Sequence, residues 1–308
     1  MKRSRTVALF LALAAVWGTA YMVTKVGLAF LPPVLLAAVR FDLAAVLLLG
    51  YVATTRSYWR PRTAADWRYV IVAGALLVAG HFAFLFAGQQ YLTSGVAAMV
   101  TGLIPVLTPL FAWVLLTDER LSASGVVGVV LGFAGTVVIA DPSFEAVLTS
   151  RLLGIALVFG ASVSIALGSV LTRRLETDLD LLPMQAWVML VGAVLLHAAS
   201  AVVEPAPSVS VTPRAVGAVL YLALVASVGG FLAYFVLLEE IGAIESNLLD
   251  YVIPVFATAS GWLVLGETVS PTSLVGFALI LLGFGLLKGR PLLRALSRAG
   301  SGTSSESR

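Results

Sequence analysis

The chain alternates between long apolar segments and short polar ones, and this pattern predicts membrane-spanning helices. A helix that crosses the apolar core of a bilayer needs about 20 mostly apolar residues. Ten segments approach or exceed this length, and stretches such as "RSYWRPRTAAD", "RRLETDLD" and "EPAPSVSVTP" separate them. The predicted spans cover residues 6–30, 33–54, 67–89, 93–116, 122–140, 151–172, 183–203, 213–237, 244–265 and 271–288.

The composition supports a bilayer as the solvent. The 308 residues are 60% hydrophobic and only 11% charged, whereas soluble domains carry about 25% charged residues. A formal net charge of +3 on such a chain does not indicate nucleic-acid binding. The absence of Cys excludes disulfides, thiolate metal sites and cysteine nucleophiles, and we expect no metal and no other cofactor.

The first span is predicted to remain in the protein. Its uncharged run from Thr6 to Thr24 is longer than the h-region of a secretory signal, which has about 7–15 residues. At the other end, residues 289–308 are predicted to form a disordered cytoplasmic tail, because their last part, "SRAGSGTSSESR", is small and polar.

The Lys and Arg residues predict the orientation. Lys25 and Arg40 lie inside predicted spans, and Arg151 and Arg214 lie in loops on one side of the membrane. The other 15 of the 19 basic residues lie in the termini and in the loops on the opposite side. Because basic residues favour the cytoplasmic side, we expect a multi-pass protein of the plasma or inner membrane with both termini cytoplasmic.

The sequence repeats itself at an offset of 149 residues. "GHFAFLFAGQQYLTSGVAAMVTGLIPV" aligns without a gap on "GGFLAYFVLLEEIGAIESNLLDYVIPV". The residues that recur identically in and just beyond this run are Gly80, Phe82, Phe86, Ile104, Pro105, Val106, Trp113 and Leu116. We therefore predict an all-α membrane protein of ten transmembrane helices, in which residues 7–140 and 151–288 form two five-helix repeats. The odd number of spans per half inverts the second repeat, as in many secondary transporters.

Several motifs carry a family resemblance. They are "VWGTAYMVTKVGL", Arg40, "GQQYLTSGVAAMV", "GVVLGFAGTVVI" and "IPVLTPLFAWVLLTDERLS" with its second copy "IPVFATASGWLVLGETVS". In this ordered set the chain resembles the drug/metabolite transporter superfamily, specifically proteins with two EamA-type domains. The resemblance covers residues 7–140 and 151–288. It implies ten helices, alternating access around a central cavity, and export of small organic molecules.

Two prolines and one acidic residue stand out within the predicted spans. Pro105 and Pro254 are expected to kink their helices, either to let them flex during access switching or as packing features. Asp250 lies about 9 Å into its span, where an unpaired carboxylate is costly. Its counterpart in the first repeat is Thr101, which is a further candidate for lining the cavity. Asp250 could carry a coupling proton, or it could be a structural carboxylate that is paired or hydrated.

Further candidates lie in the first repeat. Arg40 and Asp42 cannot pair with each other, since residues two apart on a helix point in different directions. Arg40 could pair with another carboxylate or hold the carboxylate of a substrate. His81 could contact a proton or a substrate, or it could be a packing residue. His197 is interpreted as structural.

Aromatic and amide side chains complete the candidate cavity. Trp17, Tyr21 and Tyr251 are expected to line it, and Asn247 is a further candidate. Glu119 and Glu267 are interpreted as residues that end helices at the membrane boundary. The glycines spaced along residues 125–135, together with Gly276 and Gly283, are expected to allow close helix packing or dimer contacts.

We therefore expect a secondary transporter for a small organic metabolite, most plausibly an exporter of amino acids or related compounds. The alternative is a carrier of hydrophobic drugs or lipid-like compounds. The partners expected are the substrate, protons, membrane lipids and a second copy in a homodimer. A membrane enzyme is disfavoured, because the sequence lacks an HExxH motif and a catalytic residue set, and direct use of ATP is disfavoured by the lack of a Walker A motif.

Overall fold

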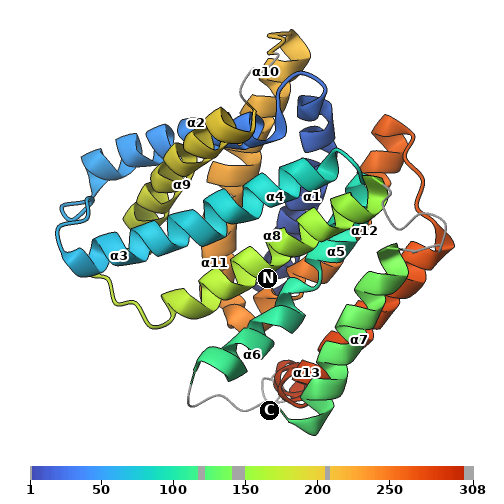
Figure 1. Ribbon diagram of the computed structural model, residues 1–308. Coiled ribbons are helices and arrows are strands. Elements are labelled where there is room, and N and C mark those ends of the chain that lie inside the picture. The colour runs from blue at the N-terminus through green and yellow to red at the C-terminus, as the bar shows by residue number, and fades with distance from the viewer. Residues whose placement is uncertain (1, 117–121, 141–149, 205–208, 302–308) are drawn as a thin grey trace.

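The computed structural model describes residues 2–116, 122–140, 150–204 and 209–301 (Figure 1). Within these ranges the chain is helical and contains no strand, as predicted. Among the described residues, eight helices are long and apolar enough to cross a membrane, and two shorter apolar helices cover Leu249–Leu265 and Pro271–Leu287. Glu119, for which a helix-ending role was predicted, lies outside the described residues.

The described residues up to Ala140 contain seven α-helices and one π-helical segment. In chain order they are α1 (Lys2–Leu28), α2 (Pro33–Thr55), α3 (Ala64–Ala73), η1 (Gly74–Gly80), α4 (His81–Gln89), α5 (Ser94–Thr101), α6 (Ile104–Leu115) and α7 (Ala123–Ala140). The elements α3, η1 and α4 follow one another directly and together form one apolar span, Ala64–Gln89.

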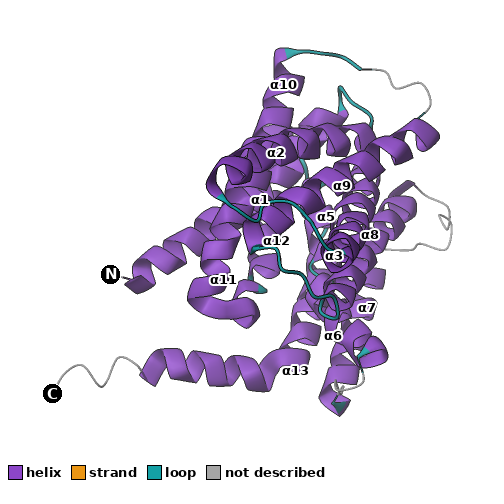
Figure 2. Ribbon diagram, turned by 90° about the vertical axis from the view of Figure 1, so that its left-hand side faces the viewer, coloured by secondary structure: helices purple, strands orange, loops and turns teal. Residues whose placement is uncertain are grey.

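The described residues from Ser150 onward contain six α-helices and a second π-helical segment. They are α8 (Ser150–Thr172), α9 (Leu181–Val203), α10 (Pro213–Leu220), η2 (Tyr221–Gly229), α11 (Gly230–Ser246), α12 (Leu249–Leu265) and α13 (Pro271–Ser301). The helix α13 runs on to Ser301, and its last part reaches away from the bundle in Figure 2. Much of the segment predicted to be a disordered tail is therefore helical, because "PLLRALSRA" is rich in strong helix formers.

Equivalent positions in the two repeats begin helices in the same way. The Thr63 hydroxyl accepts a hydrogen bond from the Asp66 backbone N–H at 3.0 Å, and Thr212 accepts one from Ala215 at 3.1 Å. Such side-chain acceptors satisfy N–H groups that have no partner within the helix. Thr63 and Thr212 are 149 residues apart, which is the offset of the sequence repeat.

The spans that contain the two conspicuous prolines are interrupted rather than simply kinked. A break at Gly102–Leu103 separates α5 from α6, and a break at Asn247–Leu248 separates α11 from α12. Pro105 is the second residue of α6, where a helix needs no donor from it, whereas Pro254 lies inside α12. The expected mid-helix position is therefore found for Pro254 only.

Both repeats also contain a π-helical segment in the same place. η1 ends at Gly80 and η2 ends at Gly229, again 149 residues apart. Long π-helical stretches are rare, and π-bulges are frequent at functional sites. Their recurrence indicates that this register belongs to the architecture of the repeat.

Several helix pairs join the repeats, and two of them, α7 with α13 and α2 with α9, lie side by side in Figure 1. Between α7 and α13 the backbones touch, since a Cβ added at Gly128 would collide with the Gly283 carbonyl oxygen and one at Gly135 with that of Gly276. Of the glycines expected to permit close packing, Gly128 and Gly135 therefore approach Gly283 and Gly276 of the other repeat, whereas Gly132 packs against Leu103.

The second pair, α2 and α9, is joined by polar contacts along its length. At one end the Glu204 carboxylate accepts from the backbone N–H groups of Val34 and Leu35, at 2.9 and 3.1 Å. In the middle, Asp42 Oδ2 and His197 Nε2 lie 2.6 Å apart, which identifies the partner of Asp42 and agrees with a structural His197. The other end carries an ion pair.

At the other end of the α2–α9 pair, Arg56 lies 3.7 Å from Asp180. There the buried Asp66 also connects the α2–α3 loop with the α8–α9 loop. Asp66 accepts hydrogen bonds from the Tyr58 hydroxyl at 2.6 Å and from the Thr177 hydroxyl at 2.9 Å. The bond to Asp66 raises the pKa of Tyr58, because the carboxylate holds the phenolic proton. This is the end predicted to face the cytoplasm.

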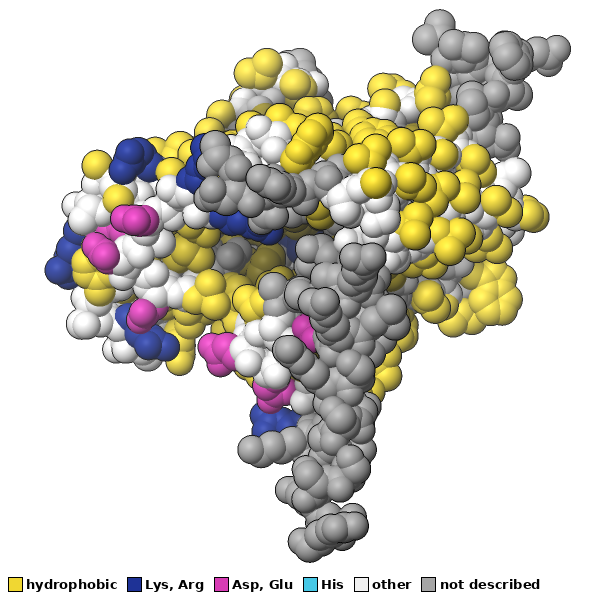
Figure 3. All heavy atoms as spheres, turned by 90° about the horizontal axis from the view of Figure 1, so that it is seen from below, with side chains coloured by type: hydrophobic (Ala, Val, Ile, Leu, Met, Phe, Trp, Pro, Cys, Tyr) yellow, Lys and Arg dark blue, Asp and Glu magenta, His cyan; other side chains and the backbone are white. Residues whose placement is uncertain are grey.

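The face seen in Figure 3 is hollowed near its middle. Charged side chains gather on one side of the hollow, and hydrophobic side chains cover much of the other. The candidate residues described next come from the helices that surround the centre of the bundle.

Candidate functional site

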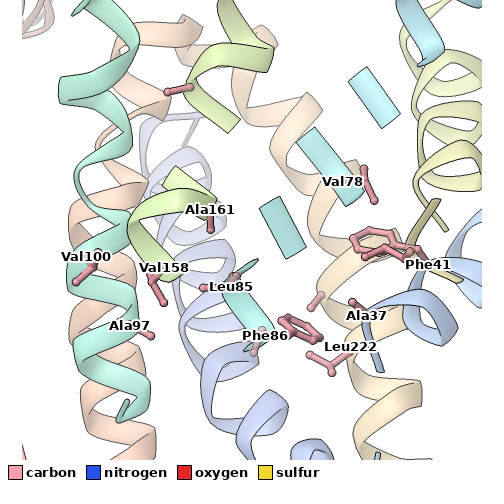
Figure 4. Close-up of a cluster of buried hydrophobic side chains, with 14 of the residues drawn as sticks. Ala37, Phe41, Val78, Leu85, Phe86, Ala97, Val100, Val158, Ala161 and Leu222 are labelled. Carbon is pink, nitrogen blue, oxygen red and sulfur yellow. The ribbon is translucent and has the colours of Figure 1, made fainter. Parts of the chain in front are cut away.

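Arg40 of α2 lies in an aromatic environment inside the protein. Its side chain is only 5% exposed. The guanidinium carbon lies 5.0 Å from the ring centre of Phe41, 4.7 Å from that of Phe82 and 5.9 Å from that of Phe86. Figure 4 shows Phe41 and Phe86 near one another where α2 and α4 approach η2. Its Nε donates to the Ser227 hydroxyl of η2 at 2.8 Å.

Within the part of the chain that the structure describes, no carboxylate lies within ion-pair distance of Arg40. A buried cation is costly without an anion, although three aromatic faces offset part of that cost. The expected structural ion pair is therefore not observed among these residues. The terminal Nη groups are left as donors for another acceptor.

Tyr21 of α1 connects the surroundings of Arg40 with those of Asp250. Its hydroxyl lies 2.7 Å from the Thr101 hydroxyl at the end of α5. The Tyr21 side chain also interacts electrostatically with both Arg40 and Asp250. The structure therefore brings four residues predicted from the sequence into one region: Tyr21 of α1, Arg40 of α2, Thr101 of α5 and Asp250 of α12.

Asp250 is the second residue of α12 and is half-buried. Among the described residues, no Lys, Arg or His lies within ion-pair distance of it. Its backbone carbonyl is also freed, because Pro254, four residues later, has no N–H to donate. The carbonyl of Thr101 lies at the end of α5, directly before the break that separates α5 from α6. The two breaks meet, since a Cβ on Gly102 would lie 3.6 Å from the Asp250 carbonyl oxygen.

Asp250 interacts electrostatically with the side chains of Tyr21, Tyr234 and Tyr251. The buried hydroxyl of Tyr251 has no hydrogen-bond partner among the described residues, and its ring packs against Phe284 with centroids 4.7 Å apart. The ring of Tyr234 in α11 packs against that of Trp17, with the ring centroids 5.5 Å apart. A buried hydroxyl that has no partner among the described residues is suited to bind a polar ligand.

Trp17 and His81 have defined roles in packing. Trp17 Nε1 donates to the Ala226 carbonyl of η2 at 3.0 Å, so its indole is held at the centre of the bundle. His81 Nδ1 lies 3.0 Å from the Ala161 carbonyl oxygen, and its ring stands edge-on to Phe82 at 4.7 Å. His81 thus supports one of the rings around Arg40. Asn247 lies in the α11–α12 break, where its carbonyl accepts from the Asp250 N–H at 3.3 Å.

Sequence analysis did not identify Ser227 as part of the site. A serine inside an apolar span has no distinguishing sequence signal, and only the packing of η2 against α2 brings it to Arg40. The aromatic row of Phe82 and Phe86 was visible in the sequence, but its contact with Arg40 was not.

The structure also has a surface cavity of about 520 Å³, but it lies away from these residues. It is lined by the α1–α2 connection, the end of α4 and residues near the end of α9, including Glu204. None of the candidate site residues lines it. We therefore place the candidate site at the centre of the bundle.

An all-helical membrane protein with two sets of related helices, interrupted spans and unpaired charges at its centre belongs to the class of transporters. The family model of the EamA-like transporter family matches residues 4–140 and 152–288. The chain therefore belongs to this family and is a multi-pass membrane transporter.

Curated relatives agree with this family. PecM of Dickeya dadantii is 30% identical, with 86% of each chain covered. A protein of Escherichia coli strain K12 named an uncharacterized inner membrane transporter, YedA, is 28% identical over 92% of each chain. A chain in a solved crystal structure aligns with a TM-score of 0.63 at 23% identity, covering 95% of this chain and 99% of that one, which shows a shared fold.

Proposed function

We propose that this protein is a secondary transporter that exports amino acids or closely related metabolites by alternating access. In this proposal the chain crosses the inner membrane ten times as two inverted repeats, with both termini in the cytoplasm. The repeated caps and π-helical segments, 149 residues apart, support the two-repeat arrangement. The distribution of Lys and Arg supports the orientation.

The observation that carries the proposal is the pair of unpaired opposite charges at the centre of the bundle. Arg40 offers free guanidinium donors and Asp250 offers a carboxylate, and Tyr21 lies close to both. An amino acid presents the complementary pair, a carboxylate for Arg40 and an ammonium group for Asp250. The aromatic rings of Trp17, Tyr234 and Tyr251 would contact the rest of such a substrate.

The same aromatic lining favours a second candidate function, the export of hydrophobic drugs or lipid-like compounds. Such a substrate would use the rings but would leave Arg40 without an anion. Since buried charges favour compensation, we rank this function below amino-acid export. Protons, membrane lipids and a second copy of the chain remain the proposed partners.

The test is substrate flux in liposomes that contain the purified chain. We expect counterflow of L-phenylalanine, L-leucine or L-threonine without added nucleotide. Arg40→Gln should raise the half-saturating concentration at least about tenfold, because hydrogen bonds to charged groups contribute strongly to binding. Arg214→Gln is the matched control, since Arg214 is exposed at the start of α10. Equal flux in Arg40→Gln and wild type would reject amino-acid recognition at Arg40.

A further inference from the structure

Ser227 has an unusual hydrogen-bond geometry. Its hydroxyl donates to the Leu222 carbonyl, five residues earlier, at 2.9 Å. In regular α-helices a serine hydroxyl bonds to the carbonyl three or four residues earlier, as Ser162 does with Val158 at 3.1 Å. The π-helical register of η2 therefore determines where the hydroxyl proton of Ser227 goes.

This register makes the Ser227 hydroxyl an acceptor toward Arg40. A hydroxyl has one proton, and Leu222 receives it, so only lone pairs remain for the Arg40 Nε–H at 2.8 Å. The buried Ser227 side chain is 0% exposed, so water does not compete for those lone pairs.

The contact with Ser227 limits how the guanidinium can bind an anion. Arginine has five N–H donors, and one of them, on Nε, is used by Ser227. The other four are on Nη1 and Nη2, and these two nitrogens can bind both oxygens of one carboxylate. The rings of Phe41 and Phe82 border the guanidinium and restrict its rotation.

The first repeat has the same π-helical register without this arrangement. There Val78 occupies the position equivalent to Ser227, 149 residues earlier, and it has no hydroxyl. The Leu76 carbonyl of η1 instead accepts a hydrogen bond from the Ser164 hydroxyl of α8, in the second repeat, at 2.7 Å. η2 instead holds two site residues through consecutive positions, since Ala226 accepts from Trp17 and Ser227 accepts from Arg40. The contact with Arg40 is therefore a feature of the second repeat alone.

We propose that Ser227 is a positioning residue for substrate recognition: it holds Arg40 with both terminal nitrogens free for the substrate carboxylate. The inference rests on the proposed function, in which Arg40 binds that carboxylate. The positioning role also predicts that Ser227 affects the binding of amino acids differently from that of amines. Loss of the Ser227 hydroxyl should weaken binding of amino acids and leave binding of the corresponding amines unchanged.

The experiment measures ligand-induced thermal stabilisation of the purified full-length chain. The probes are L-phenylalanine and L-leucine, each compared with its decarboxylated amine, 2-phenylethylamine or 3-methylbutylamine. Ser227→Ala should raise the apparent Kd for the amino acids about tenfold, as expected for loss of a hydrogen bond to a charged group. It should not change the Kd for the amines. Ser227→Thr keeps the hydroxyl and should stay within about twofold of wild type.

Two further variants separate the possible outcomes. Ser164→Ala removes another buried hydroxyl, one that donates to the Leu76 carbonyl of η1 and not to Arg40, and should leave every Kd unchanged. If Arg40→Gln weakens amino-acid binding but Ser227→Ala does not, the positioning role of Ser227 is wrong and amino-acid recognition stands. If Arg40→Gln has no effect, or if wild type is not stabilised by the amino acids, the proposed function is wrong and the role of Ser227 with it.

Discussion

At the scale of single residues, the site contains two charged side chains, Arg40 and Asp250, that have no oppositely charged partner among the described residues. Arg40 has a hydroxyl and three aromatic faces but no anion among the described residues, and Asp250 has no cation. Ionisable groups at such depth are expensive and are usually retained for function. The two residues come from different repeats, so a substrate that binds both would contact both halves of the protein.

Asp250 is also the proposed proton carrier. A carboxyl group can bind and release a proton, whereas an amide cannot. If export is coupled to proton entry, acidifying the side opposite the cytoplasm should increase wild-type efflux, and Asp250→Asn should show the same efflux with and without the gradient. The measurement is efflux from proteoliposomes at several imposed pH differences. A variant that retains the full wild-type response to the gradient would exclude this role.

At the scale of helices, the α7–α13 and α2–α9 contacts between the repeats use different chemistry. The α7–α13 contact depends on glycines that let two backbones touch, because no Cβ fits between them. The α2–α9 contact depends on polar groups at both ends and on Asp42 with His197 in the middle. Only the first contact leaves no room for a larger side chain.

A substitution at Gly135 tests this close approach. Gly135→Val should separate α7 from α13 and lower the free energy of unfolding by about 1–3 kcal/mol, as overpacking typically does. Gly50→Ala is the control, because no atom lies within 4 Å of a Cβ at Gly50 and alanine favours the helix. Thermal unfolding in the same detergent compares the two. Equal midpoints for Gly135→Val and wild type would show that the contact is looser than described.

At the scale of the whole molecule, the repeats share details of hydrogen bonding. The hydroxyls of Ser122 and Ser124 lie 3.0 Å apart, and those of Ser270 and Thr272 lie 2.8 Å apart. These pairs begin α7 and α13 and occupy equivalent positions in the two repeats. If the second repeat is inverted, equivalent positions must lie on opposite sides of the membrane.

The lack of Cys makes this prediction directly testable. Ser124→Cys and Thr272→Cys each introduce a single thiol at an exposed, equivalent position. A membrane-impermeant maleimide should label Thr272→Cys in intact cells and Ser124→Cys only after permeabilisation. Labelling of both from the same side would contradict the inverted repeat. Labelling with the two sides exchanged would contradict the orientation alone.

The sequence by itself determined the membrane class, the approximate extent of the helical segments and the relation between the two repeats. These follow from local properties, since the thickness of the bilayer sets the length of apolar runs and a repeat is visible as recurring letters. It also pointed to Arg40, Asp250, Tyr21 and Thr101, because polar groups are conspicuous in apolar segments.

Only the tertiary structure decided how these residues combine. The breaks at Gly102–Leu103 and Asn247–Leu248, and the π-helical register of η2, depend on packing between helices, which no local pattern encodes. The partners His197 for Asp42 and Ser227 for Arg40 lie 155 and 187 residues away along the chain. Such contacts form only when two distant helices fold against each other, so the sequence showed which residues were unusual and the fold determined their partners.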